Sequence, residues 1–269
     1  MSRPIKTALT IAGSDSGGGA GIQADLKTFA ALGVYGTSAI TAITAQNTVG
    51  VTTAQALAAD LVEAQIEAVA SDIHVSATKT GMLASAAIVE VVAAAITDLQ
   101  LPLVVVDPVM VAKSGDRLLD EDALTAIRRE LLRRALVVTP NIPEAEVLSG
   151  RSIASLDDAK DAAKTILELG PTAVVVKGGH GAGDELVDLL FDGRSFHELR
   201  TARIDTRNTH GTGCTFASAI AARLALGDNL LDAVQRAQAY VAGAIRHGLA
   251  IGHGHGPLDH FWNTTGLYT

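Results

Sequence analysis

Short β-branched segments alternate with longer alanine-rich segments along almost the whole chain, and this alternation limits the possible folds more than any other feature. The β-branched segments predict strands at Thr7–Ile11, Gly36–Thr44, Leu103–Asp107, Leu136–Thr139, Ala173–Lys177 and Leu186–Phe191. The alanine-rich segments predict helices at Gln23–Leu32, Ala58–Val69, Ser85–Thr97, Glu121–Arg133, Pro143–Leu148, Leu156–Leu169, Cys214–Leu226 and Leu230–His247. Alternating strands and helices form βαβ units, so we expect an α/β fold with three layers, α/β/α, around a mostly parallel central sheet.

Composition and chain length agree with that architecture. Of the 269 residues, 48% are hydrophobic but only 3% are aromatic. A core built from Ala, Val, Leu and Ile suits a parallel sheet that is covered by helices on both faces. Two short extended runs flank Asp192-Gly193 within Glu185–Arg203, which predicts a local antiparallel hairpin. No Pro/Ser-rich linker, charge block or repeat interrupts the pattern, so residues 1–269 are expected to form one domain.

The net charge and the distribution of apolar residues argue against nucleic acid and membranes as partners. The formal net charge is −8 and no dense Lys/Arg patch occurs, which argues against nucleic acid as the main partner. The start of the chain lacks the hydrophobic region of a signal peptide, and no apolar stretch is long enough to span a membrane. The single cysteine cannot form an internal disulfide, as is usual in a reducing cytoplasm. We therefore expect a cytoplasmic protein without a membrane partner.

The segment Gly211-Thr212-Gly213-Cys214 directly precedes the predicted helix Phe216–Leu226. Glycines let the backbone turn tightly and approach a ligand closely, and the free N–H groups at a helix start form an anion site. A thiol at the positive end of a helix dipole is expected to have a lowered pKa. The alternative interpretation is an ordinary turn with Cys214 as a small buried hydrophobic residue.

Polar and glycine-rich segments follow the predicted strands one after another. These segments are Ser14–Gly21, Gln46–Thr48, Asp107–Met110, Asn141–Glu144 and Lys177–Gly181. Ligands of open parallel sheets bind beyond the carboxyl ends of the strands, so one shared binding site is predicted. The glycine-rich segment fits neither a dinucleotide motif nor a P-loop, because Asp25 lies too close to be the ribose ligand and no Gly-Lys-Ser/Thr occurs. A nucleotide would therefore be bound by another design.

Seven segments in order carry a family resemblance. They are Ala12–Asp25, Thr41–Thr48, Lys79–Leu83, Asp107–Met110, Thr139–Ala145, Val176–His180 and His210–Thr215. Together they resemble the ribokinase superfamily and, within it, the hydroxymethylpyrimidine/phosphomethylpyrimidine kinases of thiamine biosynthesis. The resemblance covers nearly the whole chain. It implies a ribokinase-like three-layer fold, ATP as phosphoryl donor, Mg²⁺, and two successive phosphorylations of a small aminopyrimidine alcohol. It also suggests a homodimer.

The resemblance gives the Gly211–Cys214 segment a catalytic role. Phosphoryl transfer leaves a protein mainly positioning and charge stabilisation to supply. The N–H groups of Gly211, Thr212, Gly213 and Cys214 would hold the oxygens of the transferring phosphoryl group. Cys214 stands where many superfamily members carry an aspartate base, so its thiol looks like a replacement for that base. A lowered pKa would make the thiolate available at neutral pH but also a weaker proton acceptor.

The resemblance also implies nucleotide and metal residues. Glu144, in Asn141-x-x-Glu144, resembles an acidic motif that organises Mg²⁺, and a single carboxylate is chemically sufficient; the alternative is a first-turn glutamate that stabilises the helix dipole. Asp107 is expected to support the metal or the phosphates, and Asn141 to contribute to cofactor binding. Lys177 ends a run of valines, where a buried lysine is costly unless it meets an anion such as the phosphates of ATP. Its alternative is a lysine that simply reaches solvent.

Four residues are expected at the substrate. Gln46 offers both a donor and an acceptor to an aminopyrimidine, and the resemblance places it against that ring. Met82 offers a soft apolar face, with plain core packing as the alternative. Gly13 and Asp15 lie in the loop that would close one side of the pocket. Asp25 is left out of the catalytic set, because it could simply compensate the helix dipole at the surface.

Three functions remain to be distinguished. The leading one is the pyrimidine kinase just described. The second is a pyridoxal or pyridoxine kinase, or a dual-specificity enzyme of the same superfamily. The third is a non-catalytic, nucleotide-binding regulatory protein, against which the presence of Lys177, Glu144 and the Gly211–Cys214 segment speaks. The histidines of the C-terminal segment, His253, His255 and His260, are expected to be structural, because alternating His-Gly without a helix or strand gives poor metal geometry.

Overall fold

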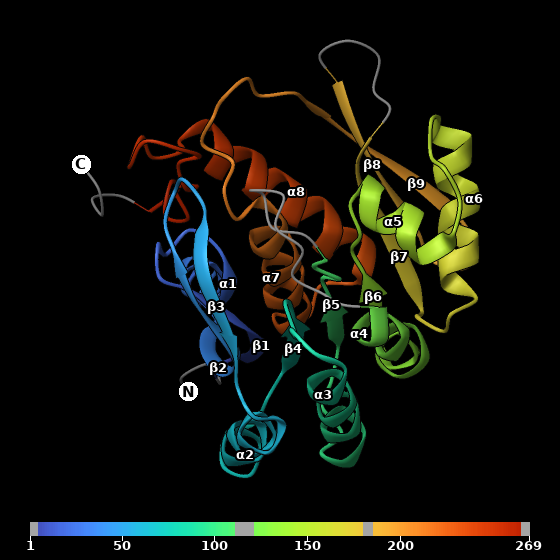
Figure 1. The fold of residues 1–269 in the computed structure, drawn as a ribbon. Coiled ribbons are helices and arrows are strands. Elements are labelled where there is room, and N and C mark those ends of the chain that lie inside the picture. Colours follow the sequence, from blue (N-terminus) through green and yellow to red (C-terminus); the bar gives the residue numbers. More distant parts are fainter. Residues whose placement is uncertain (1–4, 111–120, 180–184, 265–269) are drawn as a thin grey trace.

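One mixed β-sheet forms the centre of the molecule (Figure 1). The computed structural model describes residues 5–110, 121–179 and 185–264, so His180 and Gly181, which end two of the predicted segments, lie outside it. The strands of the described part are β1 (Thr7–Asp15), β2 (Tyr35–Gln46), β3 (Val51–Ala56), β4 (Ala77–Thr80), β5 (Val104–Val106), β6 (Val137–Val138), β7 (Ala173–Gly179), β8 (Glu185–Phe191) and β9 (Phe196–Ala202). Their order is β3-β2-β1-β4-β5-β6-β7-β8-β9. The six neighbouring strands β2, β1, β4, β5, β6 and β7 are parallel, whereas β3 pairs antiparallel with β2, β8 with β7, and β9 with β8.

Helices cover both faces of this sheet (Figure 1). They are α1 (Gly21–Ala31), α2 (Ala59–Ala70), α3 (Ala86–Asp98), α4 (Glu121–Ala126), α5 (Ile142–Ser149), α6 (Leu156–Leu167), α7 (Thr212–Ala225) and α8 (Leu230–Arg246). Helices α1, α7 and α8 share one hydrophobic core with the sheet, and α2 to α6 share the other. This arrangement confirms the predicted three-layer α/β/α fold. In the described part of the chain, no helix combines the length and the apolarity needed to cross a membrane.

The two cores explain the composition of the strands and of α7. In β5, Val104 and Val106 belong to the core on one face and Val105 to the core on the other. Burial on both faces favours apolar residues at every position, which is why β5 is a continuous run of valines. Helix α7 is buried along almost its whole length, from Thr215 to Ala222. Its small residues let it lie close to the sheet, to α1 and to α8.

The structure contains every predicted strand and helix, but two strands were missed. Strand β3 is polar and exposed at the edge of the sheet, and β4 has only four residues, which are buried between β1 and β5. Their strand character comes from pairing with neighbours, which a local pattern does not contain. The predicted helix Glu121–Arg133 is also wrong in its second half, where α4 gives way to a π turn and a 3₁₀ turn. The hairpin around Asp192-Gly193 is present as β8 and β9.

Candidate active site

A pocket of about 1060 Å³ opens at the carboxyl edge of the parallel strands. Its wall is formed by the ends of β1, β2, β4 and β7, by the segment after β5, and by the first turns of α5 and α7. All twelve residues predicted for the site line this one pocket: Gly13, Asp15, Gln46, Met82, Asp107, Asn141, Glu144, Lys177, Gly211, Thr212, Gly213 and Cys214. The parallel topology brings them together, because the carboxyl ends of such strands meet at one edge.

Helix α7 begins inside this pocket, and Gly211 is its N-cap. The backbone of Gly211 is left-handed, with φ of 84°, and no side chain caps this helix. A Cβ on Gly211 would lie 1.8 Å from the carbonyl oxygen of Gly19 in the glycine-rich loop, so only glycine permits this approach. Thr212 turns its hydroxyl back to donate to the Thr209 carbonyl at 2.8 Å. The Thr212 N–H also donates to the Thr209 carbonyl, at 3.4 Å, so among the first-turn residues that line the pocket Gly213 and Cys214 are the better candidates for an anion site.

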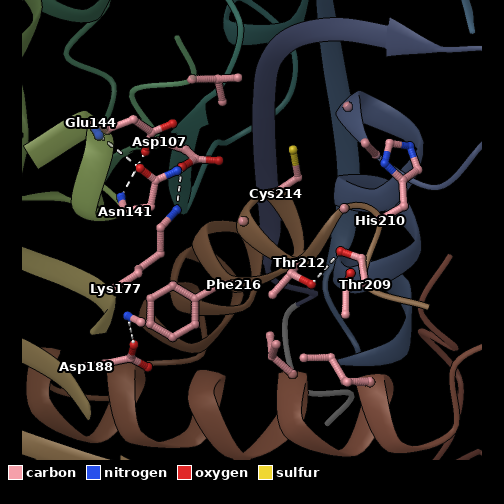
Figure 2. Close-up of a pocket in the computed structure, with 18 of the residues that line it drawn as sticks. Asp107, Asn141, Glu144, Lys177, Asp188, Thr209, His210, Thr212, Cys214 and Phe216 are labelled. Carbon is pink, nitrogen blue, oxygen red and sulfur yellow. Dashed lines mark hydrogen bonds and ion pairs between the residues drawn. The ribbon is translucent and has the colours of Figure 1, made fainter. Parts of the chain in front are cut away.

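The thiol of Cys214 lies in this first turn, between the Asp107–Lys177 group on one side and His210 on the other (Figure 2). The residue is half-buried. Burial raises the pKa of Cys214 to about 11; Lys79 opposes this shift, whereas Asp25 and Asp107 add to it. The predicted lowering of this pKa is therefore wrong. Removing the thiolate from water outweighs the stabilisation available from the helix start.

An ion pair joins the segment after β5 to the end of β7. Lys177 Nζ lies 2.9 Å from Asp107 Oδ1, and the two side chains are 15% and 2% exposed. The alternative of a lysine that reaches solvent is thus wrong. A Cβ on Gly213 would lie 3.3 Å from Lys177 Nζ and 3.6 Å from Asp107 Oδ2, so the pair stands directly against the α7 helix start. One cation and the helix N–H groups therefore face the same part of the pocket.

Glu144 and Asn141 form a capping box at the start of α5. The Asn141 side chain accepts the Glu144 N–H at 2.9 Å, and Glu144 Oε2 accepts the Asn141 N–H at 2.9 Å. The alternative role at the helix start is therefore real, although it acts through hydrogen bonds rather than the dipole alone. Burial raises the pKa of Glu144 to about 7; Lys177 opposes the shift and Asp107 adds to it. A buried carboxyl group that is costly to ionise is well suited to receive a cation.

The carboxylate of Asp15 organises the glycine-rich loop. It accepts N–H groups from Gly17 at 2.8 Å, Gly19 at 3.1 Å and Ala20 at 2.8 Å, and His210 Nε2 lies 2.9 Å away. Burial alone would raise the pKa of Asp15, but these hydrogen bonds lower it. The carboxylate is thus used to shape the loop, and its predicted contact with substrate stays a prediction.

Gln46 and Met82 line the part of the pocket nearest to this loop. Gln46 Nε2 lies 3.3 Å from His210 Nε2, while its Oε1 accepts the Thr44 hydroxyl at 3.2 Å. A Cβ on Gly13 would lie 2.3 Å from the terminal methyl carbon of Met82, so Gly13 makes room for that side chain. Sequence reasoning assigned no role to His210, although its place directly before Gly211 was a usable signal.

Two further residues were missed, Lys79 and Asp25. Both are fully buried, and Lys79 Nζ lies 2.8 Å from Asp25 Oδ2. The interpretation of Asp25 as a surface residue is wrong, since its carboxylate also accepts the hydroxyls of Thr10 and Ser218 at 2.6 Å each. Burial alone would lower the pKa of Lys79, but Asp25 leads the charges that raise it. One indication of a role for Lys79 was present in the sequence, its position at the start of the segment Lys79–Leu83 that carries part of the family resemblance.

The other end of the pocket is apolar, and no site residue was predicted there from the sequence. Its lining includes Leu186, Phe216, Val241, Ala242 and Ile245. Asp188 stands beside this wall and accepts the Gly178 N–H at 2.6 Å and the Gln238 amide at 2.8 Å. These bonds hold the residue that follows Lys177. An apolar slot next to a lysine and a helix start can take a flat ring joined to phosphates.

A comparison with protein families decides which family this is. The model of the phosphomethylpyrimidine kinase family matches residues 15–259. The chain belongs to that family. Among its relatives, the hydroxymethylpyrimidine/phosphomethylpyrimidine kinase of Bacillus subtilis is 50% identical over 258 residues, or 96% of this chain and 95% of the relative. The family resemblance of the seven segments is thus confirmed.

Other relatives show how the family fold recurs. The bifunctional thiamine biosynthesis protein of Geobacter sulfurreducens is 51% identical, but this chain spans only 52% of its length. Two solved structures share the fold. The phosphomethylpyrimidine kinase of Clostridium difficile is 45% identical, with a TM-score of 0.80 over 90% of this chain and 100% of that chain. The pyridoxal kinase of Bacillus subtilis, solved as an ADP complex, is 40% identical, with a TM-score of 0.90 over 98% of this chain and 100% of that one.

Proposed function

We propose that residues 1–269 form one kinase domain, which transfers a phosphoryl group from ATP to 4-amino-5-hydroxymethyl-2-methylpyrimidine and then to its monophosphate. The observation that carries this proposal is the single pocket in which the α7 helix start, the Lys177–Asp107 pair and Gln46 meet. The apolar slot around Phe216 is suited to the adenine ring, and the helix start to the transferring phosphoryl group (Figure 2).

The catalytic groups act mainly by placing positive charge. The N–H groups from Gly211 to Cys214 and the ammonium of Lys177 stabilise the phosphoryl oxygens as negative charge develops on them. Cys214 accepts the proton of the substrate hydroxyl. Because burial raises the pKa of this thiol to about 11, few molecules hold the thiolate at neutral pH, and ionisation of Cys214 becomes part of the barrier.

Glu144 and Asp107 fit a site for Mg²⁺. Glu144 is a buried carboxyl beside the Lys177–Asp107 pair, and burial raises its pKa more than Lys177 lowers it. Magnesium keeps several waters and requires few protein carboxylates, so these side chains are sufficient. When bound there, Mg²⁺ neutralises charge on the phosphates of ATP. Excess chelator should therefore abolish ATP consumption, and rapid turnover in its presence would remove the metal from this proposal.

Pyridoxal or pyridoxine is a second candidate substrate, and a specific observation supports it. The Bacillus subtilis pyridoxal kinase superposes on 98% of this chain with a TM-score of 0.90 at 40% identity. Both substrates are flat heteroaromatic alcohols, and Gln46 with Met82 presents a polar edge and an apolar face to either. The paired donor and acceptor of Gln46 match an aminopyrimidine better, because its ring nitrogen and amine satisfy both at once.

A substrate panel tests these assignments. ADP release is measured with hydroxymethylpyrimidine, its monophosphate, pyridoxine, pyridoxal and ribose, with ribose as the control for unspecific sugar kinase activity. We expect the highest kcat/KM with hydroxymethylpyrimidine and measurable turnover of its monophosphate. Turnover of pyridoxal alone would make the second candidate the correct one. Tight ATP binding without ADP release from any alcohol would instead support a regulatory protein.

A homodimer in the cytoplasm is the expected state of this kinase. Strand β3 has a neighbour on one side only in the described part of the sheet, and Thr52–Ala56 is exposed and uncharged. Such an edge can pair with a second copy of the chain. Light scattering should give the mass of two chains, and Thr53→Lys should shift it towards one. The single free cysteine, Cys214, agrees with a reducing compartment.

A further inference from the structure

The ion pair between Lys79 and Asp25 lies next to the reacting end of the pocket. Lys79 comes from β4 and Asp25 from α1, and both side chains are completely excluded from solvent. Lys79 nevertheless lines the pocket that holds Cys214. A buried ion pair adds little net stability, because the loss of hydration offsets most of the attraction. Stability alone is therefore a weak reason for placing two charges here.

Asp25 also fixes the face of α7 that carries Cys214. The Ser218 hydroxyl donates to Asp25 Oδ1 at 2.6 Å, and the Thr10 hydroxyl donates to Asp25 Oδ2 at 2.6 Å. Ser218 follows Cys214 by four residues, so the two side chains lie on the same face of the helix. The side of α7 that contacts Asp25 is thus the side that presents the thiol.

Lys79 lines the same pocket as this thiol, and its ammonium is tightly confined. A Cβ on Gly81 would lie 2.8 Å from Lys79 Nζ and 3.0 Å from the Ala12 Cβ, so the missing side chain of Gly81 leaves the space for the charge. Burial has the largest effect on the pKa of Cys214 and raises it, and among the charges Lys79 has the largest effect and lowers it. Asp25 and Asp107 act in the raising direction, and Lys177 also interacts with the thiol.

We propose that Lys79 is a positioning residue for phosphoryl transfer: held by Asp25, it supplies a fixed positive charge that favours the thiolate of Cys214. The proposal rests on the role of Cys214 as proton acceptor. Asp25 anchors α7 through Ser218 and partly neutralises the same charge. Because Lys79 and Asp25 have opposite signs, removing one or the other changes the charge state of the thiol in opposite directions.

The rate of alkylation measures the ionisation of the Cys214 thiol directly, since Cys214 is the only cysteine in the chain. The rate of reaction with iodoacetamide is followed against pH without substrate, and the midpoint of the profile is compared between variants. Asp25→Asn removes the negative charge that opposes Lys79, and at pH values where Lys79 keeps its proton we expect the midpoint to fall, with alkylation about tenfold faster at pH 8. The double variant Asp25→Asn/Lys79→Met removes both charges without leaving a buried one unpaired, and its midpoint should lie above that of the wild type.

Ser218→Ala is the matched control. It removes a hydrogen bond to the same carboxylate without changing any charge, so its midpoint should stay close to that of the wild type. A shift of the Ser218→Ala midpoint therefore measures the effect of changed burial of the thiol, and this shift is subtracted from those of the charge variants. Midpoints of Asp25→Asn and of the double variant that move in the same direction, or not at all, overturn the proposal.

Turnover supplies the second readout. In the double variant kcat should fall about tenfold or more, while the KM for ATP stays within about threefold, because Lys79 acts on the proton acceptor and not on nucleotide binding. An unchanged kcat also overturns the proposal. Cys214→Ala distinguishes failure of the proposed role of Lys79 from failure of the proposed role of Cys214. If this variant keeps full turnover, Cys214 is not the proton acceptor. If it loses turnover while the midpoints stay fixed, only the role of Lys79 fails.

Discussion

Gly211→Ala tests whether the close approach of the α7 helix start to the glycine-rich loop builds the phosphate site. Two costs arise at this position. An alanine with φ of 84° is left-handed, which costs about 1–2 kcal/mol. The added Cβ would also lie 1.8 Å from the Gly19 carbonyl oxygen, and both sides of that contact are backbone. Helix and loop must then separate by about 1 Å or more, which costs roughly another 1–3 kcal/mol.

Gly227→Ala provides the matched control at the other end of α7. Its φ is 99°, but no atom lies within 4 Å of the added Cβ, so it carries the conformational cost alone. We expect Gly227→Ala to lose about 1–2 kcal/mol of unfolding free energy with unchanged kcat. Gly211→Ala should lose about 2–5 kcal/mol, and its kcat should fall about 100-fold, since a displacement of about 1 Å at reacting groups has that effect.

Thermal unfolding by circular dichroism and ADP release measure the two quantities. Each kcal/mol corresponds to about 2–4 °C in Tm for a chain of this size. Gly211→Ala should therefore have the lower Tm of the two variants by several degrees. Equal Tm values, together with full turnover in Gly211→Ala, would refute the reasoning that this contact shapes the site.

Three further predictions concern single side chains. Cys214→Ala should lower turnover of the alcohol about 10²–10⁴-fold with nearly unchanged ATP binding, and less for the monophosphate, whose acceptor oxygen is already ionised. Because burial raises the pKa of Cys214 to about 11, the thiolate fraction grows with pH; wild-type kcat should rise between about pH 7 and 9 and that of the alanine variant should stay flat. Gln46→Ala should weaken binding of the pyrimidine by about 1–3 kcal/mol for each unsatisfied group and leave ATP affinity unchanged in calorimetry, whereas equal losses would make Gln46 structural. Burial lowers the pKa of His260 from 6.5 to about 4, so only the unfolded chain binds this proton between those values, and stability should fall by about 3 kcal/mol as pH decreases through that window. Urea unfolding of His260→Gln checks this, because the variant should lose that part of the pH dependence.

The sequence by itself determined the fold class and twelve of the residues that line the pocket. The valine run of β5 and the alanine-rich sequence of α7 are local patterns. The first indicates a strand buried on both faces and the second a helix buried along its length, although neither pattern says which elements bury it. Gln46 is the last residue of β2, Asp107 directly follows β5, and Lys177 lies near the end of β7. Parallel topology then forces them to one edge, so their shared pocket could be predicted from order along the chain alone.

The tertiary structure decided the burial, the charged neighbours and the pKa of each of these side chains. Asp25 and Lys79 are 54 residues apart, and only the packing of α1 and α7 against β1 and β4 makes them a buried ion pair. The pKa of Cys214 was predicted in the wrong direction, because a helix start is visible in the sequence whereas desolvation by distant segments is not. Strand β4 was missed for the same reason, since its identity comes from its neighbours β1 and β5. Local patterns record which residues are buried or capped, but electrostatics and strand pairing depend on distances across the whole fold.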